Sequence, residues 1–154
     1  MLKYLLIIFS LVYISGCTVK NNKSDRVNFE ELSKELFSSF GYTTKVIFHK
    51  EELDLINIYI SKSKMTKNDF KKNIESVLLK KGWVEIPSDF DDQFIYCFDK
   101  KNALEVLYPT KEYYGDDNGN SIDVDKDSLD KWIVTFNYNM YGMTSCSNFK
   151  NNLT

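Results

Sequence analysis

Side chains that carry oxygen recur at alternate positions in the segment Asp116–Asp127, whose sequence is DDNGNSIDVDKD. Calcium binds six to eight oxygen ligands, and calcium-binding loops supply them from positions 1, 3, 5 and 12, among others. All four of these positions hold an aspartate or an asparagine here. The pattern therefore predicts a calcium site formed by Asp116, Asn118, Asn120 and Asp127.

The same segment also departs from a calcium loop. Position 6 is Ser121 where a glycine would make the sharp turn, and position 12 is the shorter aspartate instead of glutamate. The alternative interpretation is a solvated loop between two strands, with Asn118-Gly119 as its turn and Tyr113-Tyr114-Gly115 as another turn before it. Both interpretations stay open at this point.

Asp89, Asp91 and Asp92 are further candidates for chemistry, because glycan hydrolysis needs only two carboxyl groups. They follow Pro87 and are expected to lie in a loop. The single histidine, His49, ends a predicted strand and is expected at the surface. The sequence lacks the GxSxG, HExxH, P-loop and dinucleotide-binding motifs. We therefore expect that the protein is not an enzyme.

An apolar segment, Tyr4–Ile14, has the length of a signal-peptide core. It is shorter than the ~20 residues that a membrane-spanning helix needs. The segment is followed by Ser15-Gly16-Cys17, so that a branched apolar residue and two small residues precede a cysteine. This arrangement resembles the lipobox of bacterial lipoproteins. The resemblance covers residues 1–17 and implies cleavage before Cys17, with acyl chains such as palmitate attached to its sulfur and amine.

The same resemblance implies an address and a domain organisation. Two or three acyl chains hold a protein stably at a membrane. Residue 18 is Thr18 and not the aspartate of inner-membrane retention, so we expect a lipid-anchored protein of the cell envelope at the outer membrane, facing the periplasm. We divide the chain into a signal peptide (1–16), a lipidated tether (17–26) and a single α+β domain (27–154).

Two cysteines, Cys97 and Cys146, remain as an even pair in an oxidising compartment. We predict that they form a disulfide, which the chain-entropy model credits with roughly 4 kcal/mol. The alternative is one buried and one exposed free thiol. Two distant cysteines and one histidine do not make a zinc site. We therefore expect no cofactor apart from the covalent lipid on Cys17 and calcium at residues 116–127.

The charge balance excludes one class of partner. Lys3 is the only charged residue among the first sixteen, so residues 17–154 carry 19 basic and 22 acidic side chains, a net charge of −3. A nucleic-acid-binding domain shows a concentrated basic surface instead. We expect no nucleic-acid partner.

Local patterns predict the elements. Asn28 and Thr66, the latter with Asp69 three residues on, are typical N-caps of two helices that end before Gly41 and Gly82. Apolar and β-branched runs predict the strands at residues 43–49, 53–60, 83–86, 93–99, 103–108 and 131–141.

The last of these strands alternates most clearly, with Trp132, Val134, Phe136 and Tyr138 on one face and mostly polar residues on the other. Such a strand belongs to an antiparallel sheet with one covered face. We predict an α+β fold of order α-β-β-α-β-β-β-β, in which two helices pack on one face of the sheet. Tyr113, Tyr114 and Tyr141 are expected to be exposed.

These features lead to three functional hypotheses. The first is a membrane-anchored periplasmic lipoprotein that acts by binding an envelope protein or peptidoglycan, not by catalysis. The second is an immunity or inhibitor lipoprotein that neutralises a toxin entering the periplasm. The third is a calcium-binding structural module that uses residues 116–127.

Overall fold

The computed structural model describes residues 25–147 and residue 149. The signal-like segment Tyr4–Ile14, the lipobox-like residues and Cys17 lie outside the described residues, so lipidation stays a prediction. Within the described part of the chain, no helix is long and apolar enough to cross a membrane.

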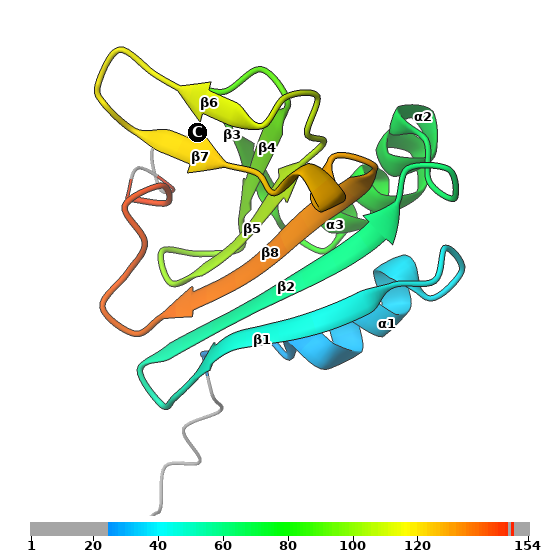
Figure 1. Ribbon diagram of the computed structural model, residues 1–154. Helices are drawn as coiled ribbons and strands as arrows, with labels where there is room; N and C mark the ends of the chain where they lie inside the picture. The colour runs from blue at the N-terminus through cyan, green and yellow to red at the C-terminus, as the bar shows by residue number, and fades with distance from the viewer. Residues whose placement is uncertain (1–24, 148, 150–154) are drawn as a thin grey trace, which may run out of the picture.

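The described chain forms an α+β fold around a six-stranded antiparallel sheet, as predicted (Figure 1). Strand order across the sheet is β1-β2-β8-β5-β4-β3, so that the last strand of the chain lies between β2 and β5. The strands are β1 (Thr43–His49), β2 (Leu53–Ser61), β3 (Val84–Ile86), β4 (Gln93–Cys97), β5 (Asn102–Leu107) and β8 (Lys131–Asn139).

The two predicted helical segments lie together on one face of this sheet (Figure 1). Helix α1 (Phe29–Phe37) begins after Asn28, whose side chain accepts a hydrogen bond from the backbone N–H of Glu31. The second segment consists of α2 (Lys67–Asp69), the π-helical η2 (Phe70–Glu75) and α3 (Ser76–Lys80). Thr66 and Asp69 form the predicted capping box at its start.

The main core fills the space between these helices and the sheet. Trp132, Phe136 and Leu104 from the sheet are fully buried, as are Phe70 and Leu78 from the second helical segment. The indole N–H of Trp132 donates a hydrogen bond to the carbonyl oxygen of Met65 at 2.7 Å, which satisfies its one polar group. Alternation along β8 is confirmed, because every second residue from Trp132 to Tyr138 is buried.

A small second sheet covers part of the opposite face. It consists of β6 (Tyr113–Gly115) and β7 (Ser121–Asp123), which pair antiparallel as a hairpin, and the short 3₁₀ helix η3 (Lys126–Ser128) follows. Tyr114 and Val124 pack with Leu107 of β5 and fasten this hairpin to the sheet. The hairpin lies over the β5 side and leaves the outer part of β1 and β2 uncovered (Figure 1).

Two predictions about this region were wrong. Residues 113–115 form a strand where we expected a turn, and Tyr114 is buried where we expected it to be exposed. The Tyr114 hydroxyl donates to the Asp92 carboxylate at 3.1 Å and accepts from the backbone N–H of Thr110 at 2.7 Å. These partners are supplied by the fold, so the three-residue pattern alone could not reveal them. The turn at Asn118-Gly119 was predicted correctly, and Gly119 has a φ of 83° there.

The C-terminal segment covers another part of the same face. Cys97 and Cys146 lie at disulfide distance, with Cα atoms 5.8 Å apart and a sequence separation of 49. Both are fully buried and pack with Ile95 and Ala103 of the sheet. The pair thus holds the segment after β8 against β4 and β5, as expected from the sequence.

Candidate binding groove

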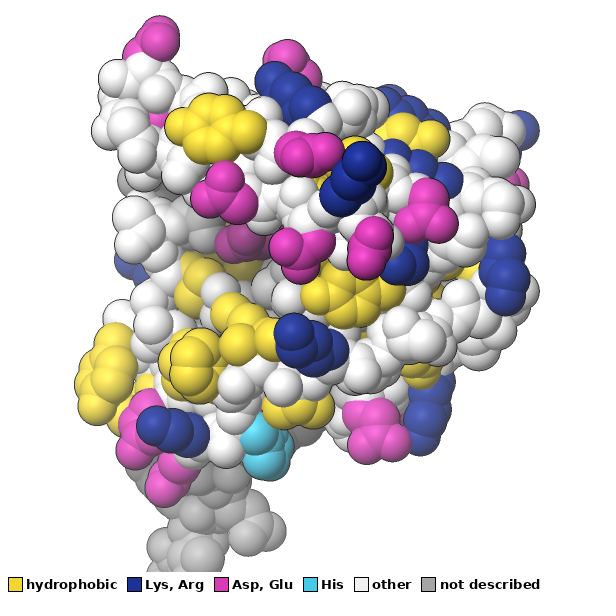
Figure 2. Space-filling view, in the orientation of Figure 1, with side chains coloured by type: hydrophobic (Ala, Val, Ile, Leu, Met, Phe, Trp, Pro, Cys, Tyr) yellow, Lys and Arg dark blue, Asp and Glu magenta, His cyan; other side chains and the backbone are white. Residues whose placement is uncertain are grey.

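A groove opens on the sheet face opposite the helices, between β2 and β8 on one side and the β6–β7 hairpin on the other. We call it the acidic groove. Its volume is about 280 Å³. Figure 2 shows the hollow, with several acidic side chains along its upper rim and hydrophobic side chains along its lower side. The residues that line it are Asn57, Tyr59, Gln93, Glu105, Leu107, Ile122, Asp123, Val124, Asp125, Ser128, Ile133 and Thr135.

Glu105 lies on the floor of the acidic groove. It belongs to β5, a central strand, and pairs across the sheet with Ile95 of β4 and Thr135 of β8. Its neighbours in sequence, Leu104 and Val106, point into the core on the other face. The strict alternation of a strand therefore places a carboxyl group in the middle of a sheet face.

The environment of Glu105 disfavours its charged form. Burial removes water from the carboxylate and raises the pKa of Glu105 above its usual range. Within the described part of the chain, the Glu105 side chain has no hydrogen bond and no ion pair. A carboxylate that is partly desolvated and unpaired has a higher affinity for a proton or for another cation than a solvated one.

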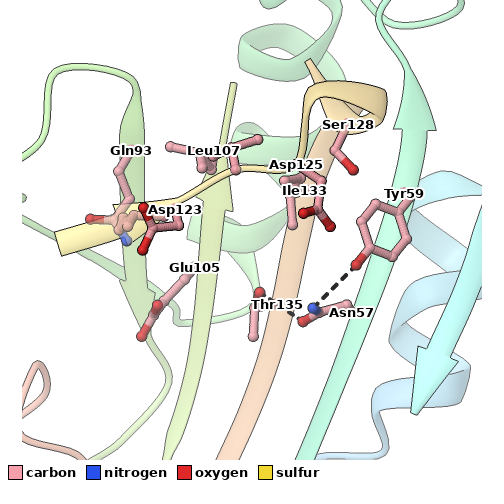
Figure 3. A pocket seen from close by; sticks show the side chains of 12 residues that line it. Asn57, Tyr59, Gln93, Glu105, Leu107, Asp123, Asp125, Ser128, Ile133 and Thr135 are labelled. Carbon is pink, nitrogen blue, oxygen red and sulfur yellow. Dashed lines mark hydrogen bonds between the residues drawn. The ribbon is translucent and has the colours of Figure 1, made fainter. Parts of the chain in front are cut away.

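The rim supplies two more carboxylates. Asp123 ends β7 and Asp125 follows two residues later, and both are exposed. Neither has an ion-pair partner among the residues that the structure describes. Val124 between them is buried against Leu107, and the two aspartates that flank it line the rim of the groove. Figure 3 shows Asp123 and Asp125 on the side of the groove formed by the end of β7 and the chain that follows it.

Uncharged polar groups line the opposite wall. Thr135 donates a hydrogen bond to the Asn57 side-chain oxygen at 3.0 Å, and the Asn57 amide donates to the Tyr59 hydroxyl at 3.4 Å (Figure 3). Asn137 lies two residues after Thr135 on β8, and its buried side-chain oxygen has no hydrogen-bond partner in the described chain. This face therefore carries one buried acceptor without a donor in the described chain, in addition to the Glu105 carboxylate.

The other candidate carboxylates have different surroundings. Asp92 accepts hydrogen bonds from the Thr110 hydroxyl at 2.6 Å and from Tyr114, and it pairs with Lys67 at 3.4 Å. Burial alone would raise the pKa of Asp92, but these donors outweigh it and the pKa is lowered. Asp89 and Asp91 are exposed loop residues. Asp92, through its contacts with Tyr114 of β6 and Lys67 of α2, joins the hairpin to the helical layer.

The predicted calcium ligands are only partly brought together. Asp116, Asn118 and Asn120 lie at the tip of the β6–β7 hairpin, whereas Asp127 lies in η3, beyond the other end of β7. The Asp116 carboxylate accepts hydrogen bonds from the side chain of Asn120 and the backbone N–H groups of Asn118 and Asn120. These bonds, the Asn120 side chain first, hold the pKa of Asp116 below its usual range.

No cluster of three or more His, Cys, Asp or Glu side chains suited to a metal ion occurs among the described residues. The calcium hypothesis remains a prediction, now limited to a hairpin turn whose first carboxylate is already bonded to backbone. His49 lies at the surface as expected, with its Nδ1 atom 3.2 Å from the Asp54 carboxylate.

Sequence reasoning did not identify Glu105, Asp123 or Asp125 as a site. One signal was available for Glu105, since it is the only charged residue in the otherwise apolar run ALEVLY. The two aspartates were considered only as part of a loop. Their position opposite Glu105 depends on how the hairpin folds back over β5. The chain matches no protein-family model, no curated protein and no solved structure.

Proposed function

We propose that this protein is a lipid-anchored protein of the cell envelope that acts by binding, and that the acidic groove receives a cationic segment of a protein partner. Cys17 would carry the anchor, and the periplasmic side of the outer membrane would be its location. The observation that carries the proposal is the group of three carboxylates, Glu105, Asp123 and Asp125, that face one groove without a basic partner in the described chain.

The chemistry of the groove favours an arginine or lysine side chain. Such a side chain brings a positive charge to a partly desolvated carboxylate, where the attraction is stronger than in bulk water. It also brings N–H donors to three carboxylates whose side chains have no donor in the described chain. Leu107 and Ile133 line the groove beside Glu105 and offer an apolar contact to the aliphatic stem.

The size of the groove limits what enters it. A volume of about 280 Å³ accommodates one or two side chains and not a folded domain. The partner would therefore insert a loop or an extended segment, while the surrounding exposed surface forms the rest of the interface. Acidic rim residues such as Asp123 and Asp125 would mainly speed association and select partners by charge.

The immunity or inhibitor version is a narrower form of the same proposal. Enzymes that act on nucleic acids carry basic surfaces, and an acidic groove complements such a surface. This version adds the expectation of a single tight complex that forms in the periplasm and blocks the enzyme's activity.

Affinity capture with charge-matched variants tests the proposal. The full-length lipoprotein, purified from membranes in detergent, would be immobilised and exposed to envelope extract and to proteins secreted by competing strains. The groove variant combines Glu105→Gln, Asp123→Asn and Asp125→Asn. The control variant makes the same change of net charge at three exposed carboxylates outside the groove, with substitutions Asp89→Asn, Asp91→Asn and Asp117→Asn.

We expect one stoichiometric protein to bind the wild type and the control and to be lost from the groove variant. Once that protein is purified, titration calorimetry should show a Kd at least tenfold weaker for Glu105→Gln alone, since a desolvated charge pair would be lost. Equal capture by all three forms, or retention of peptidoglycan fragments only, would contradict the proposed site.

A further inference from the structure

One end of the six-stranded sheet gathers exposed hydrophobic side chains. The β1–β2 turn, the β4–β5 turn and the segment after β8 all meet at this end, which we call the turn end. The backbone N–H of Met140 donates to the carbonyl oxygen of Glu52 at 2.9 Å, and the backbone N–H of Met143 donates to the carbonyl oxygen of Lys100 at 2.7 Å. Segments distant in sequence therefore form one continuous edge.

Four of the seven exposed large hydrophobic side chains in the described chain lie at the turn end. Tyr141 is 82% exposed, Phe48 46%, Phe98 39% and Met140 36%. They are spread across the end from β1 to β4 and are not gathered around one hollow. This arrangement matches a broad, flat apolar surface better than the protruding side chain of a protein partner.

The N-terminal part of the described chain is fastened to the same end. The Asp25 carboxylate accepts hydrogen bonds from Lys101 at 2.6 Å and from the Tyr138 hydroxyl at 2.9 Å. Arg26 donates to the carbonyl oxygens of Lys50 and Glu51, both in the β1–β2 turn. The first described residues, eight and nine positions after Cys17 in the sequence, are therefore held at the turn end.

We propose that the turn end rests on the membrane, with Tyr141 and Phe48 in the boundary between lipid headgroups and acyl chains. This inference rests on the proposed lipidation of Cys17. Asp25 lies eight positions after Cys17 in the sequence, a reach of at most about 28 Å. A tether of this length keeps the turn end close to the bilayer, so that even weak apolar contacts are occupied much of the time.

The composition of the turn end fits a lipid surface. Tyrosine places its ring among apolar groups and its hydroxyl in water, and lysine reaches headgroup phosphates with its ammonium group. Lys50 and Lys100 are exposed there, and Glu51 and Glu52 balance their charge. The balance predicts seating on zwitterionic lipid without a requirement for anionic lipid.

This orientation also leaves the acidic groove accessible. The groove residues Tyr59, Leu107 and Ile133 lie toward the other end of their strands. The β6–β7 hairpin that forms its rim begins after β5 has run away from the turn end. A protein seated in this way presents the groove to the periplasm.

Fluorescence quenching by lipids tests the orientation. Full-length lipoprotein would be reconstituted in phosphatidylcholine vesicles with and without bromine on the acyl chains. One variant carries Tyr141→Trp. The control carries Tyr113→Trp, at a tyrosine that is 60% exposed in β6, away from the turn end. The two native tryptophans, Trp83 and Trp132, are buried and supply a background that the wild type measures.

We expect brominated lipid to remove most of the added emission of the Tyr141→Trp variant and to leave that of the Tyr113→Trp variant unchanged. Flotation of the same vesicles tests the anchor separately, with Cys17→Ser as its control. If the wild type floats but the two added tryptophans are quenched equally, the orientation is overturned and the anchor stands. If the wild type does not float, both are overturned.

Discussion

The two faces of the six-stranded sheet are covered in different ways. On the helix-covered face, the polar groups of the core have partners, such as the Trp132 indole on Met65 and the Tyr96 hydroxyl on Glu75 at 3.0 Å. On the opposite face, Glu105 and the Asn137 oxygen have none in the described chain. A face whose polar groups are satisfied contributes stability, whereas unsatisfied acceptors beside a groove leave binding capacity for another molecule.

The largest loss of stability is expected from a core substitution on the helix-covered face. Trp132→Ala should lower the free energy of unfolding by about 3–5 kcal/mol, because it removes a fully buried ring from a packed core. Urea unfolding followed by circular dichroism measures the change. Thr135→Ala, three residues along the same strand but on the groove face, is the control and should change it by about 1 kcal/mol or less. Similar losses for both variants would remove the distinction between the faces.

The next largest loss of stability is expected when the disulfide that holds the segment after β8 on the groove face is removed. Replacing Cys97 and Cys146 together with serine should lower the free energy of unfolding by about 2–4 kcal/mol, because the unfolded chain gains the freedom of a loop of 49 residues. The same urea experiment measures it. Reducing agent should lower the stability of the wild type and leave the double variant unchanged. An insensitive wild type would mean that the two thiols are free in the purified protein.

A smaller loss of stability is expected at Thr66, the N-cap of the second helical segment. Thr66→Ala removes the side chain that accepts from the backbone N–H of Asp69 at 3.1 Å and should cost about 1 kcal/mol. Thr66→Ser keeps the hydroxyl and should restore most of the loss. Thermal unfolding of the three forms compares them. No difference between Ala and Ser would show that the cap does not stabilise this segment.

The smallest expected effect is a gain of stability, and it comes from a substitution at Glu105. Because burial raises its pKa in the folded state, the unfolded chain loses the proton first as the pH rises. The ionised carboxyl group therefore lowers the free energy of unfolding at pH values above the folded-state pKa of Glu105. Below the usual pKa of 4.5 the group is protonated in both states, so this cost is absent. Glu105→Gln should be more stable than the wild type at neutral pH and equal to it in acid.

Urea unfolding at several pH values measures this difference. Asp123→Asn, at an exposed residue on the rim, is the matched control and should show no such gain. A loss of stability for Glu105→Gln at neutral pH would mean that the carboxylate is satisfied in the fold, and it would weaken the case for the groove as a binding site.

Local sequence determined much of the fold. Asn28 and Thr66 marked the starts of both helical segments, because capping depends on residues three positions apart. The alternation from Trp132 to Tyr138 identified the buried face of β8, because a strand turns every second side chain to one side. The cysteine pair was predicted because Cys97 and Cys146 remain once Cys17 is assigned to the lipid in an oxidising compartment. These features depend on short-range geometry, which the order of residues specifies directly.

The tertiary structure decided the remainder. The position of β8 between β2 and β5 pairs residues that are up to 86 positions apart (Leu53 with Asn139), and no local pattern encodes such a choice. Tyr114 became a buried anchor only because Asp92 and Thr110 lie beside it in the fold. In the same way, Glu105, Asp123 and Asp125 became one groove only when the hairpin folded over β5. Long-range packing, which depends on the whole chain at once, assembled the candidate site.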